Sequence, residues 1–168
     1  MLEAAGLRFT VRARPVEERR EAGESPDAYA RRLARSKAEA AWEGRDEVVL
    51  GADTVVVVDG DVLEKPAGAA EARAMLARLS GLEHTVITAI CLRHPRGAEV
   101  ASESTRVRFV RLEPDEIADY VATGEPMDKA GAYGIQGLAS KFVDRIEGCY
   151  FNVMGLPVAL VYRRLKAL

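Results

Sequence analysis

Cysteine and histidine are scarce in this chain of 168 residues, and long apolar runs are missing. The two cysteines, Cys91 and Cys149, have neither metal-type nor redox-type spacing, and their apolar surroundings favour buried, reduced thiols. The two histidines, His84 and His94, are too few for a histidine-based metal site. Charged residues interrupt every apolar stretch before it reaches the roughly 18 residues of a membrane span. The first residues also lack the basic region and apolar core of a secretion signal. We therefore expect no membrane association and a cytoplasmic protein.

The chain has almost no excess of either charge. Its 24 Lys and Arg residues stand against 26 Asp and Glu residues, which gives a net charge of −2. This balance argues against a dedicated nucleic-acid-binding protein, which usually has a clearly basic face. Hydrophobic residues make up 48% and charged residues 30%, which is typical of a globular protein. The length suits a single domain with its own core, and we predict one domain over residues 1–168.

The order of the segments predicts a mixed α/β domain. Ser25 and Pro26 form a typical helix start, and apolar residues follow at helical spacing to about residue 42. Residues 47–58 form an apolar run rich in β-branched residues, as in a strand buried on both faces. Further strands are predicted at 62–63, 85–92 and 104–112, and further helices at 69–79, 113–123 and 158–167. The glycine-rich segment 124–140 is predicted to be a structured loop, and 142–146 fits a short helix or a strand.

Asp53 is the first candidate functional residue. It lies in the middle of an apolar strand, where a carboxylate is costly to desolvate unless it is paired, bound to a metal or at the edge of a cleft. Such an acid can orient a water molecule or hold a divalent cation, which suits phosphoryl chemistry. The alternative is a structural role, in which Asp53 caps a turn or pairs with an arginine.

Two lysines and a glutamine are weaker candidates. Lys65 is held by the following proline and can present a fixed ammonium to a phosphate, and Lys37 lies among alanines in the first helix. The alternative for both is an ordinary surface lysine. Gln136 lies in a segment with three glycines and offers both a donor and an acceptor to a nucleobase edge. The glycine spacing there fits neither a Rossmann nor a P-loop motif, so an ordinary glycine-rich loop is the alternative.

Taken in order, these segments resemble the Maf family of nucleoside triphosphate pyrophosphatases. The match covers essentially the whole chain and includes Ala52-Asp53-Thr54-Val55-Val56, Lys65-Pro66, Leu79-Ser80-Gly81, residues 123–126, residues 128–137 and Gly155-Leu156-Pro157. The resemblance implies an elongated α/β fold like that of inosine triphosphate pyrophosphatases, with a mixed sheet, flanking helices and two lobes around a cleft. It also implies hydrolysis of a nucleoside triphosphate to the monophosphate and pyrophosphate, with Mg²⁺ or Mn²⁺ as cofactor.

The resemblance further implies residue roles in catalysis. Asp53 matches the family's proton acceptor, which activates water for attack at the α-phosphorus. Lys37 and Lys65 match its phosphate-binding lysines. Glu18 matches, more loosely, an acid near the metal, so that Glu18 and Asp53 are the expected metal ligands.

Three more residues are expected to contact the substrate. Thr54 and Gln136 match positions linked to substrate choice, and the Tyr-Gly-Ile-Gln-Gly sequence around Gln136 is similar to the subgroup that acts on dTTP and UTP. Lys129, in the same glycine-rich segment, is a further candidate for substrate binding. The resemblance also makes a homodimer an expectation.

The N-terminus departs from the family pattern. Residues 1–9 match only the tail of the family's first helix, and the preceding strand and Ser-x-Ser-Pro-Arg-Arg loop have no counterpart here. Either a start codon assigned too far downstream or a genuine truncation explains this difference. Each arginine contact to the triphosphate is worth about 1.5–3 kcal/mol. We therefore expect the chain as given to be weakly active or inactive and a chain extended upstream to be active.

Two alternatives to dTTP and UTP hydrolysis stay open. The first is the same chemistry on a modified or purine nucleotide, because Thr54 and Gln136 alone do not fix the base. The second is a non-catalytic regulator of cell division, a role also attached to this family. Retention of Asp53, Lys37 and Lys65 favours an enzyme, because a binding module has no need of a buried acid facing two lysines.

Overall fold

The computed structural model describes residues 1–44 and 46–168, and its strands and helices follow the predicted order closely. The strands are β1 (Val49–Val58), β2 (Asp61–Leu63), β3 (Glu83–His94), β4 (Gly97–Phe109) and β5 (Val143–Glu147). The α-helices are α1 (Pro26–Ala41), α2 (Ala69–Leu79), α3 (Pro114–Ala122), α4 (Tyr150–Val153) and α5 (Val158–Leu165). Short 3₁₀ turns span Glu3–Ala5, Glu125–Asp128, Ala130–Ala132 and Leu138–Phe142.

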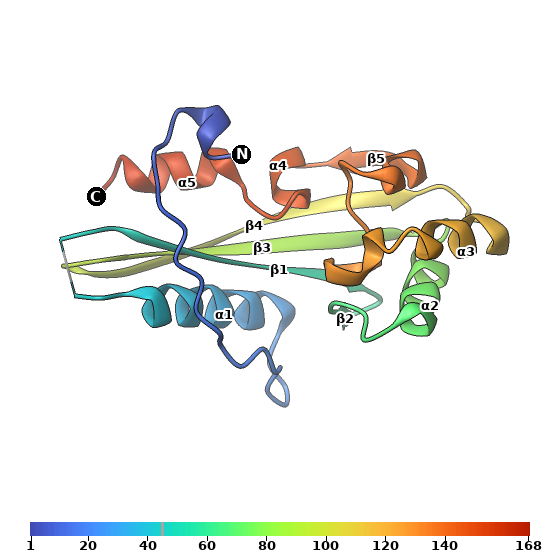
Figure 1. The fold of residues 1–168 in the computed structure, drawn as a ribbon, viewed down its shortest axis with the longest axis horizontal. Helices are drawn as coiled ribbons and strands as arrows, with labels where there is room; N and C mark the ends of the chain where they lie inside the picture. The colour runs from blue at the N-terminus through green and yellow to red at the C-terminus, as the bar shows by residue number, and fades with distance from the viewer. Residues whose placement is uncertain (45) are drawn as a thin grey trace.

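The five strands form one sheet in the order β2-β1-β3-β4-β5, and it runs along the long axis of the molecule (Figure 1). The α/β class, the flanking helices and the elongated shape are confirmed. The expected mixed sheet is corrected, because all four pairings in the described residues are antiparallel. Short connections explain two of the four pairings: β1 turns into β2 at Asp59 and Gly60, both with positive φ, and β3 turns into β4 at Pro95 and Arg96. Such tight hairpins join antiparallel neighbours.

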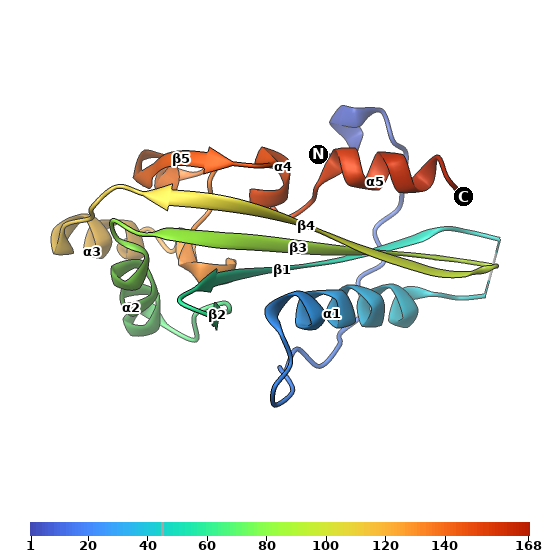
Figure 2. The ribbon, with the colours of Figure 1, turned by 180° about the vertical axis from the view of Figure 1, so that it is seen from behind.

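Helices cover both faces of the sheet (Figure 2). Buried residues of α1 recur every three or four positions, and Leu33 and Ala38 pack with Val55 and Ala89 on one face. Ile90, which follows Ala89 in β3 and faces the other way, packs with α5 on the opposite face.

A third cluster, at the far end of the sheet, contains α2, α3 and the glycine-rich segment. The core is therefore divided between two ends of the molecule, which correspond to the two expected lobes (Figure 1).

The glycine-rich segment 124–140 is a structured loop, as predicted. The carboxylate of Glu125 accepts hydrogen bonds from the Tyr120 hydroxyl and the Leu138 backbone N–H, both at 3.0 Å. Gly137 is packed against this carboxylate so closely that a Cβ there would lie 2.1 Å from Oε1 of Glu125. A side chain at this position would therefore displace the Glu125 carboxylate from these two hydrogen bonds.

Three smaller findings complete the comparison with the sequence. Residues 142–146 belong mainly to strand β5, and the one-turn helix α4 was not predicted. Both cysteines are free, but only Cys91 is buried, whereas Cys149 is half-buried. Within the described ranges, none of the helices has the length and apolar character needed to cross a membrane.

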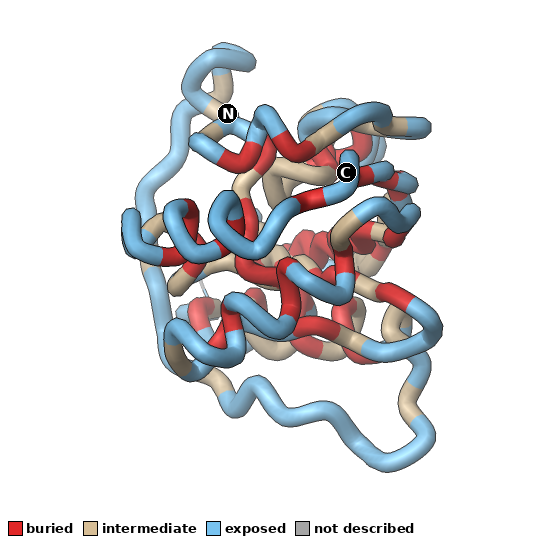
Figure 3. Tube along the Cα trace, turned by 90° about the vertical axis from the view of Figure 1, so that its right-hand side faces the viewer, coloured by how far each residue is buried: buried red, intermediate tan, exposed pale blue. Residues whose placement is uncertain are grey.

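The chain before α1 follows the surface. Between the turn at Glu3–Ala5 and α1 it forms neither helix nor strand, and most of it is exposed (Figure 3). Side-chain contacts attach it to the body: Arg12 donates to the carbonyl oxygen of Ala41 at 2.8 Å, and Arg32 of α1 pairs with Glu24 at 2.8 Å. This segment carries Glu18.

Candidate active site

A close approach between α1 and β1 brings Lys37 to Asp53. A Cβ atom at Gly51 would lie 2.3 Å from the carbonyl oxygen of Ala34 and 2.6 Å from the backbone nitrogen of Ala38. Only glycine therefore lets the helix backbone come this close to the strand. Lys37 precedes Ala38, and Asp53 follows Gly51 by two residues on the same face of the strand. The Nζ atom of Lys37 lies 2.6 Å from Oδ1 of Asp53.

Glu18 completes this cluster from the surface segment. Its Oε1 atom lies 2.7 Å from Nζ of Lys37, and its Oε2 atom lies 3.9 Å from Nζ of Lys65. Lys65 follows β2 and is the most exposed of the four, with 59% of its side-chain surface accessible. The structure therefore brings together Glu18, Lys37, Asp53 and Lys65, which the sequence had placed at four separate positions.

Burial and charge act in opposite directions on the pKa values of Asp53 and Lys37. Burial raises the pKa of Asp53, which is only 9% exposed, and the hydrogen bond from Lys37 partly opposes this shift. Burial alone would lower the pKa of Lys37, but its hydrogen bonds to Asp53 and Glu18 raise it above its ordinary value. The hydrogen bond from Lys37 also lowers the pKa of Glu18. The result is a firmly charged lysine beside a carboxylate that takes up a proton more readily than an exposed one.

Two adjoining cavities open beside this cluster, with volumes of about 280 Å³ and 120 Å³. They share Asp53, Thr54, Lys65 and Ala130. Lys37 and Lys129 also line the larger one, and its apolar lining consists mainly of Val56, Val86, Ala130, Tyr133 and Val153. A cavity lined by both cations and apolar side chains suits a ligand that joins phosphates to a base.

The substrate-choice candidates do not all reach these cavities. Thr54 lines both, and Lys129 lines the larger one, where its Nζ atom lies 2.7 Å from Oδ1 of Asp128. Gln136, in contrast, is exposed and lies outside the lining of both cavities.

Tyr29 and Glu64 are site residues that the sequence did not reveal. The Tyr29 hydroxyl donates a hydrogen bond of 2.6 Å to Oε1 of Glu64, and both residues line the smaller cavity. Burial, together with this contact, raises the pKa of Tyr29. Tyr29 lies in the predicted first helix, but the sequence analysis did not single it out. The one sequence feature that could have marked Glu64 as a site residue is its position directly before Lys65 and Pro66.

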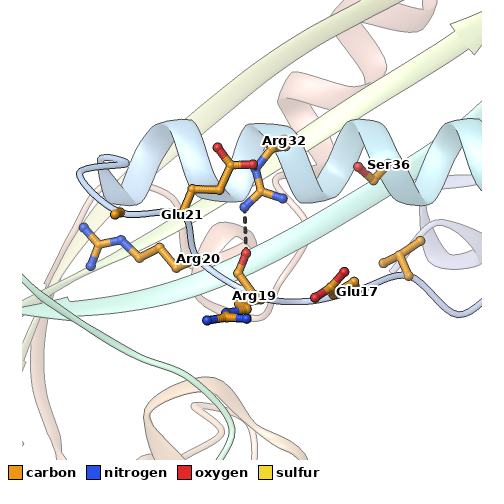
Figure 4. Close-up of a pocket in the computed structure, with 8 residues that line it drawn as sticks. Glu17, Arg19, Arg20, Glu21, Arg32 and Ser36 are labelled. Atoms are coloured by element: carbon orange, nitrogen blue, oxygen red, sulfur yellow. Dashed lines mark hydrogen bonds and ion pairs between the residues drawn. The ribbon is translucent and has the colours of Figure 1, made fainter.

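A separate cavity of about 530 Å³ lies between the surface segment and α1 (Figure 4). Arg19, Arg20 and Arg32 line it, but Arg32 is engaged with Glu24 and with the carbonyl oxygen of Arg19, at 2.8 Å each. Asp53, Lys37 and Lys65 do not line it. We therefore interpret it as the space beneath an attached surface segment.

The family model of Maf-like proteins matches residues 1–168. The chain belongs to the Maf-like protein family. It is 52% identical over 167 residues to the dTTP/UTP pyrophosphatase of Koribacter versatilis (strain Ellin345), a match that covers 99% of this chain and 86% of that protein.

Two further relatives of this Maf-like protein have the same name. The dTTP/UTP pyrophosphatase of Syntrophomonas wolfei is 50% identical over 168 residues, covering 98% of this chain and 89% of that protein. The dTTP/UTP pyrophosphatase of Aquifex aeolicus is 42% identical over 169 residues, covering 100% of this chain and 88% of that protein. The resemblance inferred from the motifs is thus confirmed at the level of the family.

The acidic residues of the site fit a divalent cation that is shared with a substrate. Among residues 1–44 and 46–168, no group of three or more His, Cys, Asp or Glu side chains is arranged to hold a metal ion. Glu18 and Asp53, however, both contact the one ammonium of Lys37, so their carboxylates lie close together. Mg²⁺ is commonly held by one or two carboxylates together with substrate phosphates and water, and this pair matches that mode.

Proposed function

We propose that this Maf-like protein hydrolyses dTTP and UTP to the corresponding monophosphate and pyrophosphate. The observation that carries the proposal is the buried Asp53 carboxylate, in contact with Lys37 and facing a cavity that Lys65 also lines. Three relatives of this chain at 42–52% identity are named dTTP/UTP pyrophosphatase, which supports the same substrates here.

The residue roles follow from charge and burial. Lys37 and Lys65 supply positive charge for the phosphate oxygens of the substrate. Asp53 accepts a proton from a water molecule, whose oxygen attacks the α-phosphorus while the bond to the α,β-bridging oxygen breaks and pyrophosphate leaves. A carboxylate whose pKa is raised by burial is a stronger base than an exposed one, which suits this role.

Glu18 and Asp53 are proposed to hold Mg²⁺ or Mn²⁺ with the help of the substrate phosphates. When bound, such a cation neutralises phosphate charge and lowers the pKa of a coordinated water molecule. The base is proposed to lie against the apolar lining of the larger cavity, near Thr54. Lys129 is proposed to contact the substrate, and the role of Gln136 in substrate choice stays a prediction from the resemblance.

Pyrophosphate release from a panel of natural nucleoside triphosphates, with Mg²⁺ and with Mn²⁺, tests the proposal. We expect dTTP and UTP to be the best substrates, with dTMP or UMP and pyrophosphate as products. Release of orthophosphate instead would contradict the reaction, and preference for a purine nucleotide would contradict the substrate. Because the chain as given is expected to be weakly active or inactive, only the absence of release from both this chain and one extended upstream would favour a non-catalytic role.

Three broader expectations are also proposals. A single domain predicts one cooperative unfolding transition, and its support is the single sheet that connects both ends of the core. A cytoplasmic location suits a nucleotide substrate, and cell fractionation tests it. A homodimer is expected from the family resemblance, and analytical ultracentrifugation tests it.

A further inference from the structure

A chain of hydrogen bonds behind the substrate cavity fixes the hydroxyl group of Thr54. Its Oγ1 atom lies 2.9 Å from Oγ1 of Thr88, which is its direct partner across the β1–β3 pairing. Oγ1 of Thr88 in turn lies 3.0 Å from the backbone carbonyl oxygen of Asn152 in α4. Thr88 and Asn152 are fully buried, whereas Thr54 is half-buried and lines both cavities.

The number of protons determines the direction of these bonds. Each threonine hydroxyl has one proton to donate, and a carbonyl oxygen can only accept. The contact with Asn152 therefore uses the proton of Thr88, so Thr54 is the donor in the contact between the two hydroxyls. A second acceptor for the Thr54 proton, the carbonyl oxygen of Gly155, lies 3.4 Å away. At 3.4 Å this second contact is at the limit of a hydrogen bond, so Thr88, at 2.9 Å, is the main acceptor. The proton of Thr54 therefore points into the protein toward Thr88, and its oxygen offers lone pairs to the cavity.

We infer that Thr88 is a positioning residue for substrate selection: it holds the hydroxyl proton of Thr54 so that Thr54 accepts the N3–H hydrogen bond of a thymine or uracil ring. Thymine and uracil have a hydrogen on N3 at neutral pH, whereas cytosine has a lone pair there. An oxygen that can only accept pairs with the first and is repelled by the second. A site built around such a donor rejects an analogue that lacks it, because the buried acceptor is then unpaired. The inference rests on the proposed function and adds to it a reason for the choice of base.

The acceptor that orients Thr88 is itself held firmly. The side-chain amide of Asn152 donates to the carbonyl oxygen of Val86 at 2.9 Å and to Oγ1 of Thr105 at 3.0 Å. Oγ1 of Thr105 also donates to the carbonyl oxygen of Cys149 at 3.2 Å and accepts from its backbone N–H at 3.0 Å. Helix α4 is thus attached to β3 and β4, and its carbonyl groups keep their direction.

Thr105 provides a matched control for Thr88. Both are fully buried threonines in neighbouring strands, and both attach α4 to the sheet. Thr105 contacts Cys149 and Asn152, whereas Thr88 contacts Asn152 and Thr54. Substitution of either by valine keeps the shape of the side chain and removes one hydroxyl, but only Thr88→Val removes the acceptor for the Thr54 proton.

The experiment measures the ratio of kcat/KM for UTP to kcat/KM for CTP in the wild type and in Thr88→Val, Thr88→Ser and Thr105→Val. We expect Thr88→Val to lower this ratio roughly tenfold, the size of one hydrogen bond. Thr88→Ser should restore it, because serine returns the hydroxyl. Thr105→Val should keep the wild-type ratio even where its stability falls. In a Thr54→Val background, Thr88→Val should have no further effect on the ratio, because the two residues act as one unit.

An unchanged ratio in Thr88→Val overturns the inference, and so does an equal fall in Thr105→Val, which would assign the effect to the attachment of α4. If Thr88→Val does not fold, turnover of N3-methyl-UTP by the wild type is measured instead. Turnover equal to that of UTP overturns the inference. Failure of the proposed function is seen separately, as a wild type that releases no pyrophosphate from UTP or dTTP. The dissociation constants of UTP and CTP then replace kcat/KM in the same comparison.

Discussion

The Nζ atom of Lys37 lies 2.6 Å from Oδ1 of Asp53 and 2.7 Å from Oε1 of Glu18, so one ammonium joins two carboxylates from distant parts of the chain. Asp53 is 9% exposed, and a buried carboxylate without a partner would be strongly destabilising. Lys37 therefore offsets the burial of Asp53 and also sets how readily it takes up a proton. The reactivity of Asp53 should depend on Lys37 for this reason.

Asp53→Asn should abolish most turnover and leave the fold intact. Loss of a general base costs about 10²- to 10⁴-fold in rate. The asparagine oxygen can still accept from Lys37, and because burial raises the pKa of Asp53, removal of its charge should not lower the free energy of unfolding. Steady-state kinetics and denaturant unfolding check both parts. Asp61→Asn, at an exposed position of β2, is the control and should keep wild-type kinetics. Wild-type turnover in Asp53→Asn would remove Asp53 from the mechanism.

Lys37→Met should move the acidic limb of the kcat pH profile to higher pH. Lys37 favours the ionised form of Asp53 and so lowers its pKa, and loss of the lysine raises that pKa. The base acts only when ionised, so a higher pH is then needed to reach full activity. Lys141→Met, at an exposed position outside the two site cavities, should leave the limb in place. An unmoved limb in Lys37→Met would show that Asp53 does not titrate in that range.

Local patterns were enough to predict the elements that carry the site. Ser25 is the N-cap of α1, as its position before Pro26 indicated, and the apolar run gave β1 within two residues. Asp53 became a candidate because it is a carboxylate in an apolar strand, and the family resemblance strengthened the weaker case for Lys37. The contact between the two is a tertiary feature. It depends on Gly51, whose missing side chain lets α1 approach β1, and no periodicity shows such an approach.

Other features were beyond the sequence because they depend on contacts between distant residues. Tyr29 and Glu64 are 35 positions apart, and their hydrogen bond exists only after β2 has folded back beside α1. The exposure of Gln136 follows from the path of the glycine-rich loop around Glu125, which motif matching does not describe. The sequence predicted the strands but not their directions. The β1–β3 and β4–β5 pairings bring together strands separated by helices or turns in the chain, so they too are tertiary features.

His84 should make the protein less stable in mild acid. It is 2% exposed, and burial lowers its pKa to about 4 from an ordinary value of 6.5. The unfolded chain thus binds this proton at a higher pH than the folded chain. The stabilisation is complete above about pH 6.5 and is lost as pH falls toward 4, by about 3 kcal/mol from the pKa difference.

Measurement of the free energy of unfolding against pH, in the wild type and His84→Gln, checks this expectation. The substitution should flatten the slope between pH 6.5 and 4. Tyr133→Phe is the matched control: it removes the hydroxyl that lies 2.8 Å from Nε2 of His84 but keeps the ring that buries it. Because burial is the cause of the shift, Tyr133→Phe should keep the slope, and a flattened slope there would assign the shift to the hydrogen bond instead.

Gly51→Ala should damage stability and catalysis together. The added methyl group would overlap the backbone of α1 at Ala34 and Ala38, and backbone atoms cannot rotate away as a flexible side chain can. Overpacking of this kind costs about 1–3 kcal/mol. The helix must move outward, which lengthens the contact between Lys37 and Asp53. We therefore expect kcat/KM to fall and the acidic limb of the pH profile to shift in the same direction as in Lys37→Met.

Gly68→Ala adds the same methyl group in open space and should have a much smaller effect on stability, on kcat/KM and on the pH profile. A Gly51→Ala protein with wild-type stability and an unmoved pH profile would show that the approach of α1 does not set the Lys37–Asp53 contact.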